Sequence, residues 1–238
     1  SDLGMDNVAS TALWNVVKTA AKNGYSTLSY AGVWTAYQTT DCDANGKIID
    51  MYGGYSFTYS SNQCGNYSNP GDCYNREHSI PKSWFGSSEA ADTPGTDLFH
   101  LVPTDGKINN TRGNYPFGEV ANASNTYDKN NVVSKFGTAK SITIDNTMLG
   151  TSYTATCSSN VFEPDDQYKG DFARGYLGTL LRWNSDYTAF TADYGSSTFS
   201  GTYTAAGHWG LTEYGIALLL KWHRQDPVSQ KEIDRNNG

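Results

Sequence analysis

The chain has 238 residues and a formal net charge of −7, so it can bury a substantial core but is too acidic to capture nucleic acid over a broad surface. Its 17 Tyr and 6 Trp, with abundant Gly, Ser, Thr and Asn, are typical of an extracellular protein rich in loops and strands. No apolar run approaches the roughly 20 residues of a membrane-spanning helix, which argues against an integral membrane protein.

The first quarter of the chain predicts helices followed by a strand region. Apolar residues recur at helical spacing over residues 6–23. A second helix is expected to begin after Ser29. Residues 47–59 then read as strand, interrupted by a turn or bulge at Gly53-Gly54.

Four cysteines lack the paired spacing of zinc ligands. Two disulfides, formed in an oxidising compartment, fit them better. Three pairings are open, of which Cys64–Cys73 together with Cys42–Cys157 is preferred. The alternative is that some of these cysteines are buried free thiols.

The second half of the chain predicts a mixture of strands and helices. Residues 119–160 alternate polar and β-branched side chains, as strands do. Helical periodicity returns over residues 169–182 and again from about 212 to 224. Between these helices, residues 184–207 form a connection whose length is uncommon in a compact domain unless it has a function.

The C-terminal residues predict one more helix. Ser229 and Glu232 form a capping-box pattern two residues after Pro227. A helix that ends at Gly238 would be short and marginal on its own, so we expect the natural protein to continue further. A single domain over residues 1–238 is the simplest organisation.

The residues with the clearest chemical potential lie in two segments about 30 residues apart. The first places Glu77 directly beside His78, and the second ends in Asn109 on a short helix for which Thr104 is the expected N-cap. If the first segment is a strand, the two side chains point to opposite faces. His78 must then lie at a strand end or in a bend for both to reach one phosphate.

Hydrolysis of a phosphodiester needs a base near neutral pH and positive charge beside the phosphate. Imidazole is the side chain with a suitable pKa, which makes His78 the candidate base. A carboxylate from Glu77 and an amide oxygen from Asn109 are suitable ligands for a hard divalent cation such as Mg²⁺. That cation would also bring positive charge to a protein whose net charge of −7 otherwise disfavours binding of nucleic acid.

Several cations are candidates for contacts with substrate phosphates. They are Arg76, Lys82, Lys107 and Arg112. For Arg112, a plain surface charge is the alternative. Arg174 stands at helical spacing from Asp171, so a structural ion pair competes with a phosphate contact there.

Three short patterns sharpen this interpretation. They are Glu77-His78-x-x-Pro81-x-x-Trp84-Phe85-Gly86, Asp97-Leu98-x-x-Leu101-x-Pro103 and Asn109-x-x-Arg112-x-Asn114. Later blocks agree in order, at residues 162–164, 169–174 and 222–228. Together they resemble the signature of the bacterial endonuclease I family, the secreted and periplasmic ββα-metal (His-Me finger) nucleases.

The resemblance implies an α+β fold, with helices and short strands around a ββα-metal core at about residues 70–118. It implies that His78 activates water while Glu77 and Asn109 bind Mg²⁺, with Ca²⁺ or Mn²⁺ as alternatives. The expected protein is a secreted or periplasmic monomer, with lipid-anchored export left open. Members of the family cut DNA, and often RNA too, with little sequence preference and leave 5′-phosphates, so the same activity is expected here.

One feature departs from the family pattern. Some members carry a transition-state arginine between the two motifs, but residues 83–96 contain no arginine or lysine. Arg112 is the replacement candidate, followed by Arg174 and Lys82.

Two other function classes compete with a nuclease. A secreted glycan-binding module would suit the abundant Tyr, Trp and Asn, but it leaves Glu77, His78 and Asn109 unexplained. A metal phosphodiesterase for small or lipid esters would use the same residues and would leave DNA intact.

Overall fold

The computed structural model describes residues 7–146, 151–183, 190–200 and 210–238. The helices in these ranges are α1 (Asn7–Lys22), α2 (Gly32–Thr40), α3 (Gly106–Arg112), α4 (Lys169–Trp183), α5 (Glu213–Gln225) and α6 (Gln230–Asn237). The strands are β1 (Lys47–Ile49), β2 (Ser56–Thr58), β3 (Tyr74–His78), β4 (Leu101–Asp105), β5 (Val120–Lys129), β6 (Val132–Ala139), β7 (Ile142–Asn146), β8 (Thr151–Ala155) and β9 (Asn160–Glu163). This is the α+β fold that the sequence predicts.

The strands form small antiparallel sheets. In the described ranges, β1 pairs with β2, β3 with β4 and β7 with β8, and a three-stranded sheet has the order β5-β6-β9. The expected interruption at Gly53-Gly54 is the connection between β1 and β2. Most of the predicted connection 184–207 lies outside the described residues, except for 190–200, which contain a 3-10 turn at Asp193–Ser197.

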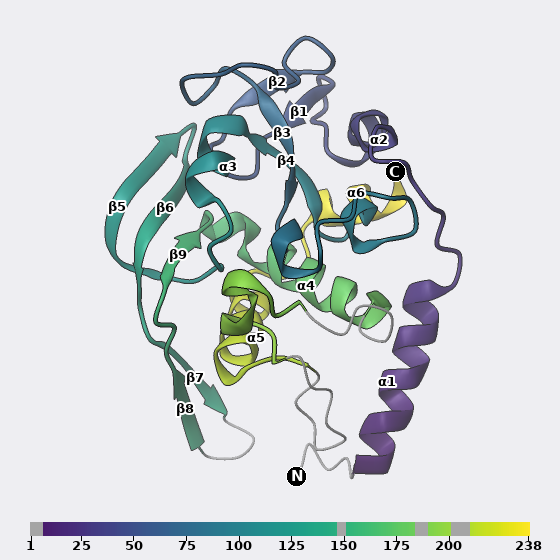
Figure 1. Cartoon of the computed structure of the whole chain (residues 1–238), viewed down its shortest axis with the longest axis vertical. Coiled ribbons are helices and arrows are strands. Elements are labelled where there is room, and N and C mark those ends of the chain that lie inside the picture. Colours follow the sequence, from purple (N-terminus) through teal and green to yellow (C-terminus); the bar gives the residue numbers. More distant parts are fainter. Residues whose placement is uncertain (1–6, 147–150, 184–189, 201–209) are drawn as a thin grey trace.

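The main core lies where α4 and α5 pack together. Figure 1 shows these two helices in the middle of the molecule, with the β5-β6-β9 sheet on one side and α1 on the other. Phe117 lies at the centre of an aromatic cluster, 4.8 Å from Phe172, 5.4 Å from Tyr176 and 5.9 Å from Trp222 between ring centroids. Burial of such rings supplies much of the driving force for folding.

The cysteines behave in two ways. Cys64 and Cys73 form the predicted disulfide, with their Cα atoms 4.9 Å apart. The predicted Cys42–Cys157 disulfide is wrong, because both residues are free thiols. The Cys42 thiol donates to the Gln38 carbonyl at the end of α2, whereas Cys157 lies beside Ser159 after β8.

The disulfide packs against the first residue of α3. A Cβ atom on Gly106 would lie 2.4 Å from Cys64 Sγ, so only glycine permits this approach. The Gly106 amide also donates to the Cys73 carbonyl over 2.9 Å. The bridge therefore fixes the point at which the chain turns from β4 into α3.

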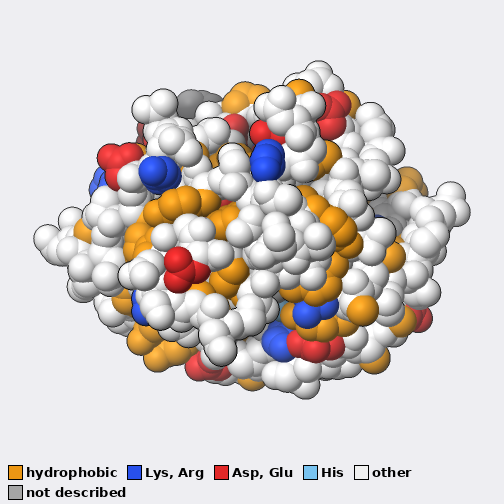
Figure 2. Space-filling view, turned by 90° about the horizontal axis from the view of Figure 1, so that it is seen from above, with side chains coloured by type: hydrophobic (Ala, Val, Ile, Leu, Met, Phe, Trp, Pro, Cys, Tyr) orange, Lys and Arg blue, Asp and Glu red, His pale blue; other side chains and the backbone are white. Residues whose placement is uncertain are grey.

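Charged side chains are spread thinly over the surface that Figure 2 shows. On this face, which carries β1 and β2 in Figure 1, lysines and arginines stand singly or next to acids and form no continuous basic band. The surface thus agrees with the net charge of −7.

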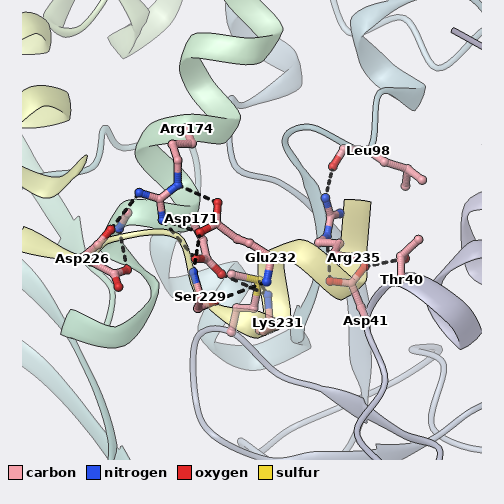
Figure 3. Close-up of polar contacts among 12 residues, drawn as sticks. Thr40, Asp41, Leu98, Asp171, Arg174, Asp226, Ser229, Lys231, Glu232 and Arg235 are labelled. Carbon is pink, nitrogen blue, oxygen red and sulfur yellow. Dashed lines mark hydrogen bonds and ion pairs between the residues drawn. The ribbon is translucent and has the colours of Figure 1, made fainter. Parts of the chain in front are cut away.

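The predicted capping box is present at the start of α6. The Ser229 hydroxyl accepts from the Glu232 amide, and the Glu232 carboxylate accepts from the Ser229 amide. Figure 3 shows how side chains on α6 then reach the rest of the fold. Glu232 forms a two-point ion pair with Arg174 of α4, and Lys231 lies 3.1 Å from Asp171 of the same helix. Tertiary contacts therefore stabilise this short helix.

Arg235 makes the second attachment of α6. It lies 2.9 Å from the buried carboxylate of Asp41 and donates to the carbonyls of Leu98 and Leu101 over 2.5 and 2.9 Å. Leu98 precedes β4, and Leu101 is the first residue of that strand. The last helix thus supports the ends of α2 and β4 together.

We predict that Arg235→Ala lowers the free energy of unfolding by about 3 kcal/mol, because it leaves the buried Asp41 carboxylate without its cation. Urea unfolding followed by circular dichroism measures the change. Arg224→Ala, on the exposed surface of α5, is the control and should change stability by less than about 0.5 kcal/mol. Equal effects of the two substitutions would contradict a role for Arg235 in holding α6.

Candidate active site

Two antiparallel strands and the helix that follows them carry the candidate residues. β3 pairs with β4 so that His78 faces Leu101 and Tyr74 faces Asp105, and α3 begins at the next residue. Asp105 is the N-cap, since its carboxylate accepts from the Ile108 amide over 2.8 Å. The predicted N-cap at Thr104 is therefore wrong by one residue, because α3 begins at Gly106 and Asp105 is the residue directly before it.

Alternation along β3 separates Glu77 from His78 in the expected way. His78 is the last residue of the strand, and the two side chains leave it on opposite faces. Both nevertheless line one cleft of about 500 Å³, together with Asn109 of α3. The structure thus brings the predicted base and both predicted metal ligands to a shared cavity.

The hydrogen bond of His78 assigns its tautomer. Nε2 lies 2.9 Å from the carbonyl oxygen of Gly95. Because a carbonyl oxygen only accepts, Nε2 carries the proton and Nδ1 keeps its lone pair. Burial lowers the pKa of His78 well below its ordinary value, and nearby His100 acts in the same direction. The imidazole is therefore a neutral base at neutral pH.

Gly95 can hold this position only as glycine. A Cβ atom on it would lie 1.8 Å from the carbonyl oxygen of Ser88. The turn that contains it is further fixed by Thr93, whose hydroxyl accepts from the Gly95 amide over 3.3 Å. The acceptor that orients His78 is thus a backbone atom in a tightly packed turn.

Glu77 is a buried carboxylate, only 4% exposed. Its Oε1 accepts from Arg112 over 2.7 Å and from the Tyr52 hydroxyl over 2.8 Å. Burial raises the pKa of Glu77, while Arg112 and Tyr52 act in the opposite direction. Within the described ranges, Oε2 has no side-chain partner.

Arg112 is completely buried, which corrects both sequence-based interpretations of it. Its guanidinium donates to Glu77, to the carbonyls of His78 and Ser79 over 3.0 and 2.6 Å, and to the carbonyl of Tyr115 over 3.0 Å. It is not a surface charge, and its donors point to protein acceptors and not to the cleft. The structure therefore gives no support to the predicted catalytic contact and shows Arg112 holding the residues around it.

Asn109 offers the second oxygen. It lies on the first turns of α3, is partly exposed and lines the cleft. No other described residue forms a hydrogen bond with its side-chain amide. An amide oxygen that faces a polar cleft in this way is free to bind an ion or a substrate.

Two of the predicted phosphate contacts line the cleft. Arg76 lies 3.5 Å from the ring centroid of Tyr30 and 4.5 Å from that of Trp34, and it donates to the Tyr30 carbonyl over 2.5 Å. Lys82 forms an ion pair with Glu89. Both cations are therefore held at the cleft by neighbours from the same chain.

The other predicted phosphate contacts are elsewhere. Lys107 lies on α3 but outside the cleft lining. Arg174 binds Glu232 and lies 3.5 Å from Asp171, so the structural ion pair is confirmed and the phosphate contact is not supported.

The donor set suits a hard cation better than a zinc ion. In the part of the chain that the structure describes, no cluster of three or more His, Cys, Asp or Glu side chains could hold a metal. One carboxylate and one amide at the cleft leave several coordination positions for water and substrate. The oxygen donors of Glu77 and Asn109 are therefore of the kind that Mg²⁺ or Ca²⁺ would accept as ligands.

Three residues that shape the site escaped the sequence interpretation. Tyr52 donates to Glu77, Gly95 orients His78, and the Tyr30 ring stacks 5.7 Å from the His78 ring. Tyr52 lies between two short strands, and Gly95 acts through its backbone. Neither feature leaves a recognisable pattern in one sequence.

Comparison with known proteins gives consistent matches. The family model described as Endonuclease I matches residues 7–238. An extracellular ribonuclease of Bacillus amyloliquefaciens is 32% identical over 216 residues, which cover 90% of this chain and 62% of the relative. An extracellular ribonuclease of Bacillus subtilis (strain 168) is 31% identical over 218 residues, with the same coverage of 90% and 62%. The chain thus spans 62% of the length of these relatives.

We predict that Arg112→Met lowers the free energy of unfolding by about 3–5 kcal/mol, because it leaves Glu77 buried without a cation. The double variant Glu77→Gln/Arg112→Met should lose clearly less than the sum of the two single variants, since neither charge then remains. Denaturant titrations of all four proteins measure this coupling. Strict additivity would show that the ion pair does not stabilise the site.

His100 should make stability depend on pH. Its Nε2 donates to Pro94 and its Nδ1 accepts from the Ile80 amide, so protonation of Nδ1 breaks a buried hydrogen bond. Burial lowers the pKa of His100 to about 4. Because the unfolded chain binds its proton at about pH 6.5, stability should fall as the pH drops from 6.5 towards 4, by about 2 kcal/mol at pH 5.

Urea unfolding at pH 7 and pH 5 measures the effect of His100. His100→Leu should remove this part of the pH dependence, whereas His223→Gln, on the exposed surface of α5, should keep it. An unchanged difference between the two pH values in His100→Leu would contradict the assignment.

Proposed function

The chain belongs to the endonuclease I family, and from this premise we propose that it is a secreted, metal-dependent endonuclease for DNA and RNA. The observation that carries the proposal is the shared cleft, which joins an imidazole with a free lone pair to a buried carboxylate and an unpartnered amide. The products expected from such chemistry are 5′-phosphates. Sequence preference should be low.

Two features support an extracellular location. Both Bacillus relatives are named extracellular ribonucleases. The Cys64–Cys73 disulfide is of the kind that persists in oxidising compartments. Among the described helices, none has the length and apolarity to cross a bilayer.

His78 would act as the general base through Nδ1. Its Nε2–H donates to the Gly95 carbonyl, which keeps the ring in one orientation and one tautomer. Nδ1 is then the atom that takes a proton from the attacking water. Because the pKa of His78 is low, the ring is ready to accept that proton at neutral pH.

Glu77 and Asn109 would hold the divalent cation. When bound, that cation offsets the negative charge that develops on the phosphate. Arg112 and Tyr52 both bind Oε1 of Glu77, so they fix the carboxylate and leave Oε2 available. Arg112 thereby contributes to the site without touching the substrate.

Arg76 and Lys82 would bind the phosphates that flank the cut. Both line the cleft, and stacking of Arg76 between Tyr30 and Trp34 limits the entropy lost on binding. Lys82 must exchange its ion pair with Glu89 for a phosphate. These two residues place positive charge locally in an acidic protein.

We predict that the wild-type chain nicks plasmid DNA and cuts single-stranded RNA with Mg²⁺, and that a chelator stops both. His78→Ala should lower the rate by a factor on the order of 10²–10⁴, because the base is lost. Gel assays with quenched time points measure the rates. His223→Ala is the matched control and should retain full activity.

Glu77→Gln and Asn109→Ala should raise the Mg²⁺ concentration needed for half-maximal activity. Far-ultraviolet circular dichroism must show that each variant is folded. Cleavage that persists in His78→Ala, or that is indifferent to chelation, would refute the assigned roles. Binding of nucleic acid or glycan without any cleavage would instead favour a binding module.

A further inference from the structure

Electrostatic attraction alone would give this cleft only a low affinity for nucleic acid. The chain carries a net charge of −7, and the cations in the cleft lining are Arg76 and Lys82, each with partners in the chain. Proteins that bind through the phosphate backbone neutralise several phosphates at once. Another source of binding energy is therefore needed close to the site.

An aromatic stack lies next to two of the residues that line the cleft. The ring of Tyr115 lies 5.0 Å from that of Phe136 and 4.6 Å from that of Tyr194, and the two tyrosine rings are within 27° of parallel. Tyr194 ends the stack and is 36% exposed. Over the described ranges, the ring contact of Tyr194 is with Tyr115, and more than a third of Tyr194 is accessible.

Two connections fix the stack beside the cleft. Tyr115 directly follows Asn114, which lines the cleft and whose carbonyl accepts from Trp84 Nε1 over 3.2 Å. Asp193, the neighbour of Tyr194, accepts from Ser83 over 3.0 Å, and Ser83 also lines the cleft. Tyr194 is therefore connected to the cleft lining twice, through its ring contact with Tyr115 and through its neighbour Asp193.

The aromatic residues that line the cleft itself differ from Tyr194. The guanidinium of Arg76 already lies over the rings of Tyr30 and Trp34, at 3.5 and 4.5 Å from their centroids. These rings act by holding the cation. Tyr194 has no such occupant.

We propose that Tyr194, supported by Tyr115, stacks on an unpaired base next to the scissile phosphate, so that the enzyme prefers single-stranded nucleic acid. This inference rests on the nuclease function proposed above. Stacking on an aromatic ring contributes about 1–3 kcal/mol per base and accepts any base. In a duplex the bases are stacked on one another inside the helix and cannot reach the ring.

Binding tests the platform independently of catalysis. In the presence of a chelator, fluorescence anisotropy gives the Kd for a short single-stranded oligonucleotide and for the corresponding duplex. Tyr194→Ala should weaken single-strand binding about 10-fold and leave duplex binding unchanged. Tyr194→Phe and Tyr194→Trp should bind like the wild type, because they keep a ring.

Tyr153→Ala is the matched control, since Tyr153 is a partly exposed tyrosine of β8 in the hairpin far from β3 and β4 (Figure 1). It should change neither Kd. Equal weakening of single-strand and duplex binding by Tyr194→Ala, or no weakening, would overturn the platform. So would a loss in Tyr194→Phe as large as that in Tyr194→Ala.

Cleavage mapping adds a test on the unmodified protein. With Mg²⁺, a single strand that carries one stable abasic residue should show cleavage suppressed about 10-fold at a bond next to that residue, and Tyr194→Ala should remove this position effect. Equal cleavage by the wild type at all bonds, including those next to the abasic residue, would contradict the proposal. If no bond is cut in any substrate, the nuclease function fails, while the anisotropy result still decides whether Tyr194 binds bases.

Discussion

The buried ion pair between Glu77 and Arg112 is the interaction on which the site depends. Arg112 closes α3, and its guanidinium holds the Glu77 carboxylate and the carbonyls of the two residues that follow it. It thereby fixes the end of β3 against the helix that carries Asn109. Removal of either charge leaves the other buried without its counter-charge, which is among the most costly changes a fold can suffer.

The same pair is compatible with the proposed binding of phosphates at this cleft of an acidic protein. A carboxylate neutralised from behind by a buried arginine contributes an oxygen at the surface with little net repulsion. Positive charge at the cleft then comes from Arg76, held by aromatic rings, and from Lys82. Binding energy is thus concentrated in a small region and does not require a basic surface.

Much of this arrangement could be predicted from the sequence, but only where side-chain identity carries the information. The motifs predicted that Glu77, His78 and Asn109 belong to one site, and all three line one cleft. Strand alternation required His78 to lie at a strand end or in a bend, and it is the last residue of β3. The role of Arg112 could not be predicted, because nothing in Asn-x-x-Arg distinguishes an arginine that faces substrate from one that faces the core. The Cys42–Cys157 pairing failed for a related reason, since spacing along the chain does not give distance in space.

The carbonyl of Gly95 has a consequence for how such a protein tolerates mutation. Every amino acid supplies the same main-chain oxygen, so no codon change at position 95 deletes the acceptor that orients His78. What a change can do is push the turn outwards, because Ser88 leaves no room for a larger residue. Natural variation around this turn should accordingly be limited by volume and not by functional group, and a search for invariant polar side chains would overlook it.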